Sequence, residues 1–301
     1  MKDSLKFIKH NKVVHDKIAP FYDSRHVEIF NPEEQKRIKS VLIRAVSEIK
    51  TESPQPIVLD FGAGTGNLTY HLMDLNVRVV AADISENSLQ QLISKVSKKD
   101  GLSIKILHGE DLSQFNDNSF DMVATYSVLH HISNYLKIVE EFVRVVKPGG
   151  VIYIDHEVCP SYWEHNVLYQ AYLSELGYQF AQAHLKELGL IHHQMKKTED
   201  IVKIIVNSFY KALKTFSLKA IMIKINNLLR SKSQPKDEGD IHVHKNDHIE
   251  WEKIKKALSP SHEIVDEVDY LVCREPNSAK VWQKWHDKCV DMRMIIARIN
   301  D

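Results

Sequence analysis

Glycines and a carboxylate follow a short apolar run near residue 60, and residues of these types suit the binding of a nucleotide. The run Ile57–Leu59 has two β-branched members and predicts a strand buried on both faces. It ends at Asp60, and the next residues include Gly62, Gly64 and Gly66. Glycine allows the backbone angles of a sharp strand-to-helix turn and lets a ligand approach the main chain and the helix N-terminus. A tight turn without a ligand is the alternative interpretation.

A second carboxylate stands where the ribose of a nucleotide would need it. The stretch 77–82 predicts the next strand, and it ends at Asp83, about 20 residues after the glycine turn. The two oxygens of a carboxylate can accept hydrogen bonds from a vicinal diol. The alternative is that Asp83 only caps the helix predicted over residues 85–96. The spacing favours the ribose role.

The register of the glycines separates two classes of cofactor. A dinucleotide fingerprint would place its third glycine where the chain has Asn67. The stretch Asp60–Gly66 instead resembles motif I of the class I S-adenosylmethionine-dependent methyltransferases, and Asp83-Ile84-Ser85 resembles the acidic motif that follows it. The resemblance extends from about Val58 to Glu157. It is strongest to the broad small-molecule group that includes the quinone-biosynthesis methyltransferases.

This resemblance implies that S-adenosyl-L-methionine is the cofactor and that a small organic molecule accepts the methyl group. O-methylation is favoured, N- or C-methylation stays open, and the acceptor classes include lipid-like molecules, glycans and secondary metabolites. Either Glu110 or Asp111 would contact the adenine amino group. Tyr22 lies in a segment that closes over the cofactor in similar enzymes, and packing of Phe21 and Tyr22 among the N-terminal helices is the alternative. The implied cofactor contacts are Tyr22, Asp60, Gly62, Ala63, Gly64, Gly66, Asp83, Ile84, Glu110, Asp111, Leu112, Thr125 and Tyr126.

Histidines after two predicted strands are the candidate catalytic groups. His130 and His131 follow the strand predicted over 120–126, in a segment similar to the V-L-H-H of small-molecule methyltransferases, and His156 follows the strand predicted over 151–154. Histidine can remove a proton from a phenol or an alcohol near pH 7. A purely structural role for the paired histidines is the alternative. His156 and Glu157 are expected on the substrate side.

A metal site is not expected from the sequence. His242, His244 and His248 are close together, and the first two would share one face of a strand. Neither a cysteine nor a carboxylate completes a ligand set with them. His242 or His244 could instead face the active site.

The elements that must position these groups alternate between strand and helix. They predict an α/β fold with a Rossmann-like seven-stranded mixed sheet, an antiparallel last strand, helices on both faces and a helical insertion after strand five. A helix is expected to begin after Asn31, with Pro32 at its first position. The predicted parts are an N-terminal helical cap (1–50), a cofactor-binding core (51–159), a helical insertion (160–240) and the rest of the sheet (241–301).

Composition limits the partners. The 301 residues carry a formal net charge of zero, which disfavours nucleic acid, and the three cysteines form no C-x-x-C pair. No apolar run reaches the length of a membrane span, so a cytoplasmic protein is expected. Residues 201–236 contain lysines but neither Asp nor Glu. A substrate lid is favoured for the insertion, and a dimer face or contact of 201–230 with an anionic membrane are its alternatives. An NAD-dependent oxidoreductase and a non-catalytic S-adenosylmethionine-binding protein are the alternative functions.

Overall fold

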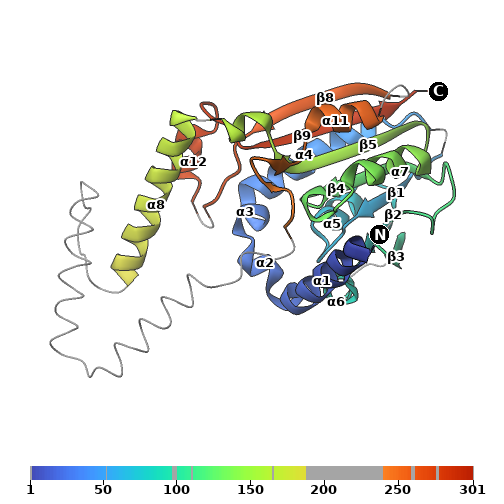
Figure 1. The fold of residues 1–301 in the computed structure, drawn as a ribbon, viewed down its shortest axis with the longest axis horizontal. Coiled ribbons are helices and arrows are strands. Elements are labelled where there is room, and N and C mark those ends of the chain that lie inside the picture. The colour runs from blue at the N-terminus through green and yellow to red at the C-terminus, as the bar shows by residue number, and fades with distance from the viewer. Residues whose placement is uncertain are drawn as a thin grey trace. The chain divides into compact units, whose positions relative to one another are not determined.

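The computed structural model describes residues 2–51, 53–96, 100–109, 111–164, 166–187, 240–258, 262–275 and 278–300 (Figure 1). The chain divides into two units, residues 1–166 with 238–301, and residues 167–237. Each unit is described by itself. Most of the predicted insertion, including the basic stretch 201–230, lies outside the described residues, which hold only helix α8 (Val167–Glu187) of the second unit.

The first unit is built on a seven-stranded mixed sheet. Its strand order is β3-β2-β1-β4-β5-β9-β8. The first five strands are mutually parallel, whereas β9 runs antiparallel to both of its neighbours, β5 and β8. The strands are β1 (Ile57–Phe61), β2 (Arg78–Asp83), β3 (Leu102–Ile106), β4 (Phe120–Tyr126), β5 (Val146–Val158), β8 (His262–Tyr270) and β9 (Met292–Ile299). This topology confirms the predicted fold class.

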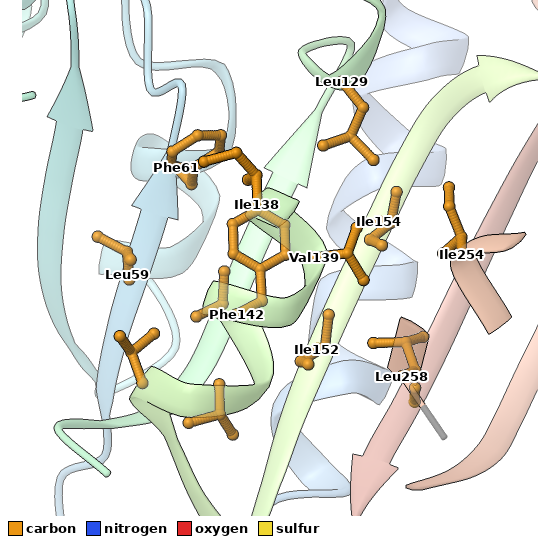
Figure 2. Packing of buried hydrophobic residues seen from close by; sticks show 14 of the residues in the cluster. Leu59, Phe61, Leu129, Ile138, Val139, Phe142, Ile152, Ile154, Ile254 and Leu258 are labelled. Atoms are coloured by element: carbon orange, nitrogen blue, oxygen red, sulfur yellow. The ribbon is translucent and has the colours of Figure 1, made fainter. Parts of the chain in front are cut away.

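Helices cover both faces of the sheet because each has one apolar side. On one face, α4 (Pro32–Ser47) and α5 (Asn67–Met73) pack on strands β1, β2, β4 and β9. On the other, α7 (Tyr135–Val145) and α11 (Trp251–Leu258) bury their apolar stripes. Figure 2 shows Val139 and Phe142 of α7 beside Leu59 and Ile152 of the strands.

The predicted start of α4 is confirmed. Asn31 precedes Pro32, and its side chain accepts a hydrogen bond from the backbone amide of Glu34. The same side chain donates to the carbonyl of Cys273, 2.7 Å away, and so ties the start of α4 to the chain that follows β8. The cap therefore fixes the position of Glu34, a residue of the site described below.

The N-terminal residues form short helices that lead to α4. These are α1 (Lys2–Ile18), η1 (Ala19–Phe21), α2 (Tyr22–Arg25) and α3 (Val27–Phe30). Helix α1 packs against α6 (Glu86–Lys95), which follows β2. The remaining elements are η2 (Leu129–His131), η3 (Pro160–Trp163), the two-residue strands β6 (Val243–His244) and β7 (Asp247–His248), and α12 (Lys280–Trp285). In the described part of the chain, no helix is both long and apolar enough to cross a membrane.

Candidate functional site

A cleft opens at the carboxyl ends of strands β1, β2 and β4, where ligands bind in open parallel sheets. Its volume is about 1120 Å³ with its open mouth included. It is lined by the glycine turn after β1, by the residues that follow β2, β3 and β4, and by one side of α1.

Two positions of the glycine turn exclude a side chain, Gly62 by lack of space and by its backbone conformation, Gly64 by its backbone conformation alone. Gly62 has a φ of +73°, and a Cβ added there would lie 2.4 Å from Cγ2 of Val128. Gly64 has a φ of +51° and lines the cleft with its backbone. Both positions therefore require glycine, and the second lets a ligand reach the main chain.

Asp83 presents its carboxylate to the cleft from the end of β2. One oxygen accepts a hydrogen bond from the amide of Gly64 at 2.8 Å, and the other accepts one from the amide of Ser85 at 2.7 Å. Burial raises the pKa of Asp83, because the charged form loses its hydration. Each oxygen keeps a lone pair for a further donor such as a hydroxyl group.

Asp60 lies behind the glycine turn. It is 1% exposed, and Oγ1 of Thr69 donates to its Oδ2 at 2.5 Å. Burial raises the pKa of Asp60 to about 7, and the nearby charge of Asp83 adds to the shift. Asp60 does not line the cleft. Its hydrogen bond with Thr69 connects the end of β1 to helix α5, which follows the glycine turn.

The far end of the cleft is apolar. Ile84, Leu107 and Gly109 line it together with Ile8 of α1. A Cβ at Gly109 would lie 2.8 Å from Cγ2 of Ile8, so helix α1 packs directly against this glycine.

Asp111 supplies a carboxylate to this apolar end. The hydroxyl and amide of Ser113 both donate to Asp111 Oδ1, and these bonds lower its pKa. Leu112 is buried in the core, and its amide donates to Glu141. Glu110 lies outside the described residues.

Helix α1 forms a roof that is attached to both rims of the cleft. Asn11 donates to the carbonyl of His131 at 2.8 Å on one rim. On the other rim, Lys12 donates to the carbonyl of Ile84 at 3.1 Å, and Asp16 accepts from the hydroxyl of Ser85 at 2.7 Å. These residues were not predicted from the sequence, because no motif marks them. Only Tyr22, which also lines the cleft, was predicted from this region.

Tyr126 connects the cleft to a buried polar network under its floor. Its hydroxyl donates to Oε1 of Glu34 at 2.8 Å and lies 2.7 Å from Nδ1 of His156. The rings of Tyr126 and His156 are stacked, with centroids 4.6 Å apart. Burial alone would raise the pKa of Glu34, but the charge and hydrogen bonds of Arg37 and His156 lower it to about 2. The network thus holds a carboxylate one hydrogen bond away from a residue of the cleft.

Arg37 pairs with both carboxylates of this network, Glu34 and Asp155. Its guanidinium donates to Asp155 at 2.7 Å and to the hydroxyl of Tyr270 at 2.9 Å, besides its bonds to Glu34. Tyr270 also donates to the second oxygen of Asp155 at 2.8 Å. Buried charges are tolerated when they are paired in this way. The predicted residue His156 joins this network, because its Nδ1 lies 3.3 Å from the hydroxyl of Tyr270 and its amide donates to Asp155 at 2.7 Å.

The paired histidines of η2 have different surroundings. His131 lines the cleft, whereas His130 is turned towards β5, where its Nδ1 lies 2.9 Å from Oε2 of Glu157. Glu157 is 2% exposed and also accepts hydrogen bonds from the amides of Val128 and Leu129. Glu157 therefore fixes both the turn after β4 and the ring of His130.

Of the predicted residues that the structure describes, one group lines the cleft and the other does not. The lining residues are Tyr22, Gly62, Gly64, Asp83, Ile84, Asp111, Tyr126 and His131. The residues that do not line it are Asp60, Ala63, Gly66, Leu112, Thr125, His130 and His156. His242 is held by Asp247 and by the carbonyl of Ile132, and its chain neighbours His244 and His248 lie on the short β6–β7 hairpin.

The chain is similar in sequence to known methyltransferases. Residues 59–154 match the model of a family described as "Methyltransferase domain". A demethylmenaquinone methyltransferase of Renibacterium salmoninarum is 30% identical over 159 residues, which are 52% of this chain and 63% of that protein. One of Bacillus cereus is 28% identical over 207 residues, which are 66% of this chain and 84% of that protein. A solved structure of a putative S-adenosylmethionine-dependent methyltransferase from Listeria monocytogenes aligns with a TM-score of 0.48 at 13% identity, covering 88% of this chain and all of that one.

Proposed function

The chain belongs to the class I S-adenosylmethionine-dependent methyltransferases and is related to their quinone-biosynthesis members, and from this premise we propose that it transfers a methyl group from S-adenosyl-L-methionine to a small organic acceptor. The observation that carries the proposal is the cleft in which Gly64, Asp83 and Tyr126 converge at the carboxyl edge of the sheet. O-methylation is the favoured reaction.

The residues present fit the cofactor. At Gly64 the turn leaves space that a side chain would fill, and Asp83 offers a free lone pair on each oxygen to the ribose hydroxyls. Ile8, Ile84 and Leu107 would enclose the adenine, whose amino group Asp111 would bind. When bound, S-adenosylmethionine supplies an electrophilic methyl group, so orientation of the acceptor accounts for much of the rate.

The chain's own residues would do three things for this reaction. The roof formed by α1 would exclude water from the cleft. Tyr126, fixed by Glu34 and His156, would set the position of the acceptor. His131, at the cleft surface, would hold the proton that leaves an acceptor hydroxyl.

The acceptor is proposed to be a lipid-like or quinone-like molecule. The relatives named demethylmenaquinone methyltransferase support this class. The chain covers 63% of the first of these relatives, so the acceptor is proposed from the shared domain and from the apolar lining of the cleft.

Calorimetry with the full chain tests the cofactor. S-adenosylmethionine and its demethylated product should bind with micromolar affinity, whereas NAD should not bind. Binding of NAD in place of S-adenosylmethionine would support the alternative, an NAD-dependent oxidoreductase, and would refute the proposal.

Methyl transfer is then measured with cofactor labelled in the methyl group and a panel of acceptors: a demethylated quinol, a simple phenol, an amine and a long-chain alcohol. We expect label in an oxygen-linked methyl group of a phenolic or quinol acceptor. Cofactor binding without transfer to any acceptor would instead support a non-catalytic S-adenosylmethionine-binding protein.

A further inference from the structure

We propose that His130, His131 and Asp240 form a binding site for a divalent transition-metal ion of the zinc type at the mouth of the cleft. One ligand atom from each side chain lies within 4.8 Å of the other two. Oδ1 of Asp240 is 3.1 Å from Nδ1 of His131 and 3.7 Å from Nε2 of His130. Ligand atoms about 2.1 Å from a tetrahedral zinc ion stand roughly 3.4 Å apart, so small side-chain adjustments would suffice.

Glu157 prepares one of these ligands. The Nδ1 atom of His130 lies 2.9 Å from Oε2 of the buried Glu157, so this carboxylate favours the tautomer that carries its proton on Nδ1 and that coordinates metals through Nε2. Nε2 is the atom that faces Asp240. A carboxylate behind a histidine ligand is the usual outer arrangement of protein metal sites, where it fixes the tautomer and the ring orientation.

The backbone brings Asp240 to the histidines. The amides of Ile241 and His242 both donate to the carbonyl of His130, at 3.0 and 3.2 Å. The ring of His242 is in turn hydrogen-bonded to the carbonyl of Ile132 at 3.0 Å. Residues 240–242 are thus attached to the segment 130–132 at several points. These backbone contacts fix the position of Asp240, the third ligand.

Two imidazoles and one carboxylate are a ligand set found at catalytic zinc and iron centres that keep an open coordination position. His131 lines the cleft, so the open position would face the acceptor. This role rests on the proposed function, but it takes His131 as a ligand in place of its role as proton acceptor: the ion would lower the pKa of an acceptor hydroxyl, which would lose its proton to solvent. The oxygen would then form a bond to the methyl carbon while the carbon–sulfur electron pair returns to sulfur.

Visible spectroscopy of cobalt(II) tests the site directly. The full chain is treated with a chelator and titrated with Co²⁺, whose absorption between about 500 and 700 nm becomes intense in a tetrahedral site with nitrogen and oxygen ligands. We expect one equivalent to bind and to be displaced by Zn²⁺. Asp240→Asn and His130→Gln should each weaken binding by at least tenfold, and Glu157→Gln by about 10- to 100-fold.

His244→Ala is the matched control, because His244 is an exposed histidine close to Asp240 in sequence, and it should leave the spectrum unchanged. The inference fails if the wild type shows no stoichiometric spectrum, or if Asp240→Asn and His130→Gln leave it intact. Calorimetry with S-adenosylmethionine on the same proteins separates the two proposals. Cofactor binding without metal binding overturns only this inference, whereas metal binding without cofactor binding overturns only the proposed function.

Discussion

Asp83 is the single residue on which cofactor binding should depend most. Its two oxygens are oriented by the amides of Gly64 and Ser85, so they cannot turn away from the cleft. We predict that Asp83→Asn weakens S-adenosylmethionine binding by about 10- to 100-fold, because hydrogen bonds to a charged group are worth about 1.5–3 kcal/mol. Calorimetry measures the change.

The control for this variant is Asp74→Asn, which removes an exposed carboxylate just after α5. It should leave the dissociation constant within about twofold, since surface ion pairs contribute little. Equal affinity of Asp83→Asn and the wild type would show that the carboxylate does not bind the ribose.

Asp60 should make stability depend on pH. Its folded-state pKa is raised from 3.8 to about 7, so the folded protein binds more protons than the unfolded chain between these values. The free energy of unfolding therefore falls as pH rises from about 4 to 7. The pKa shift corresponds to a loss of about 4 kcal/mol at most in the free energy of unfolding. This loss is complete above pH 7 and absent below pH 4.

Asp60→Asn removes this cost while its amide oxygen can still accept from Thr69. Urea unfolding should find the variant more stable than the wild type at pH 8, with the difference shrinking towards pH 4.5. A variant that is less stable at pH 8 would contradict the raised pKa.

At the scale of the element, α1 is the part of the fold that should control access to the cofactor. Asp16 attaches its C-terminal end to α6 through the hydroxyl of Ser85 and the amide of Asn87. We predict that Asp16→Ala raises the dissociation constant of S-adenosylmethionine by several-fold and speeds hydrogen exchange in the α1 amides, because the roof opens more often.

Lys9→Ala serves as the control, since Lys9 is exposed on the same helix. It should change neither the affinity nor the exchange rates. If the exchange of α1 in Asp16→Ala matches that of the wild type, Asp16 does not hold the roof closed.

Elements of the core were predictable because their signals are local. Strands β1 and β4 each contain a short uninterrupted apolar run, Ile57–Leu59 and Met122–Ala124, and the cap at Asn31 and the glycine turn each occupy only a few neighbouring residues. The spacing from the turn to Asp83 then located a second group of the cleft, since successive strands of such a sheet end at one edge.

Contacts between distant parts of the chain could not be predicted from the sequence. Asn11 reaches the carbonyl of His131 over a separation of 120 residues, and Tyr126 reaches Glu34 over 92. Such pairs depend on how α1 and α4 pack on the sheet, and no periodicity or motif encodes that geometry. Asp240 is a similar case, because its place beside His131 follows from the path by which the chain returns to the core.

At the scale of the whole molecule, residues 167–237 should be dispensable for cofactor binding. The apolar clusters of the first unit draw their members from residues before 167 and after 237. The cleft is likewise lined by residues 8–138. A variant in which a flexible linker of about ten residues replaces 167–237 should therefore bind S-adenosylmethionine with an affinity within about threefold of the wild type.

The same variant tests the proposal that this segment is a lid for the acceptor. Methyl transfer to a lipid-like acceptor should fall by at least tenfold in kcat/KM, while the affinity for the cofactor is kept, because only the acceptor would lose its contacts. Unchanged kcat/KM would show that the acceptor does not need the segment.

A matched flotation experiment with anionic vesicles tests the alternative, contact of this segment with a membrane. If the full chain floats and the deletion variant does not, residues 167–237 bind the membrane surface, which would support the alternative of a membrane contact through 201–230.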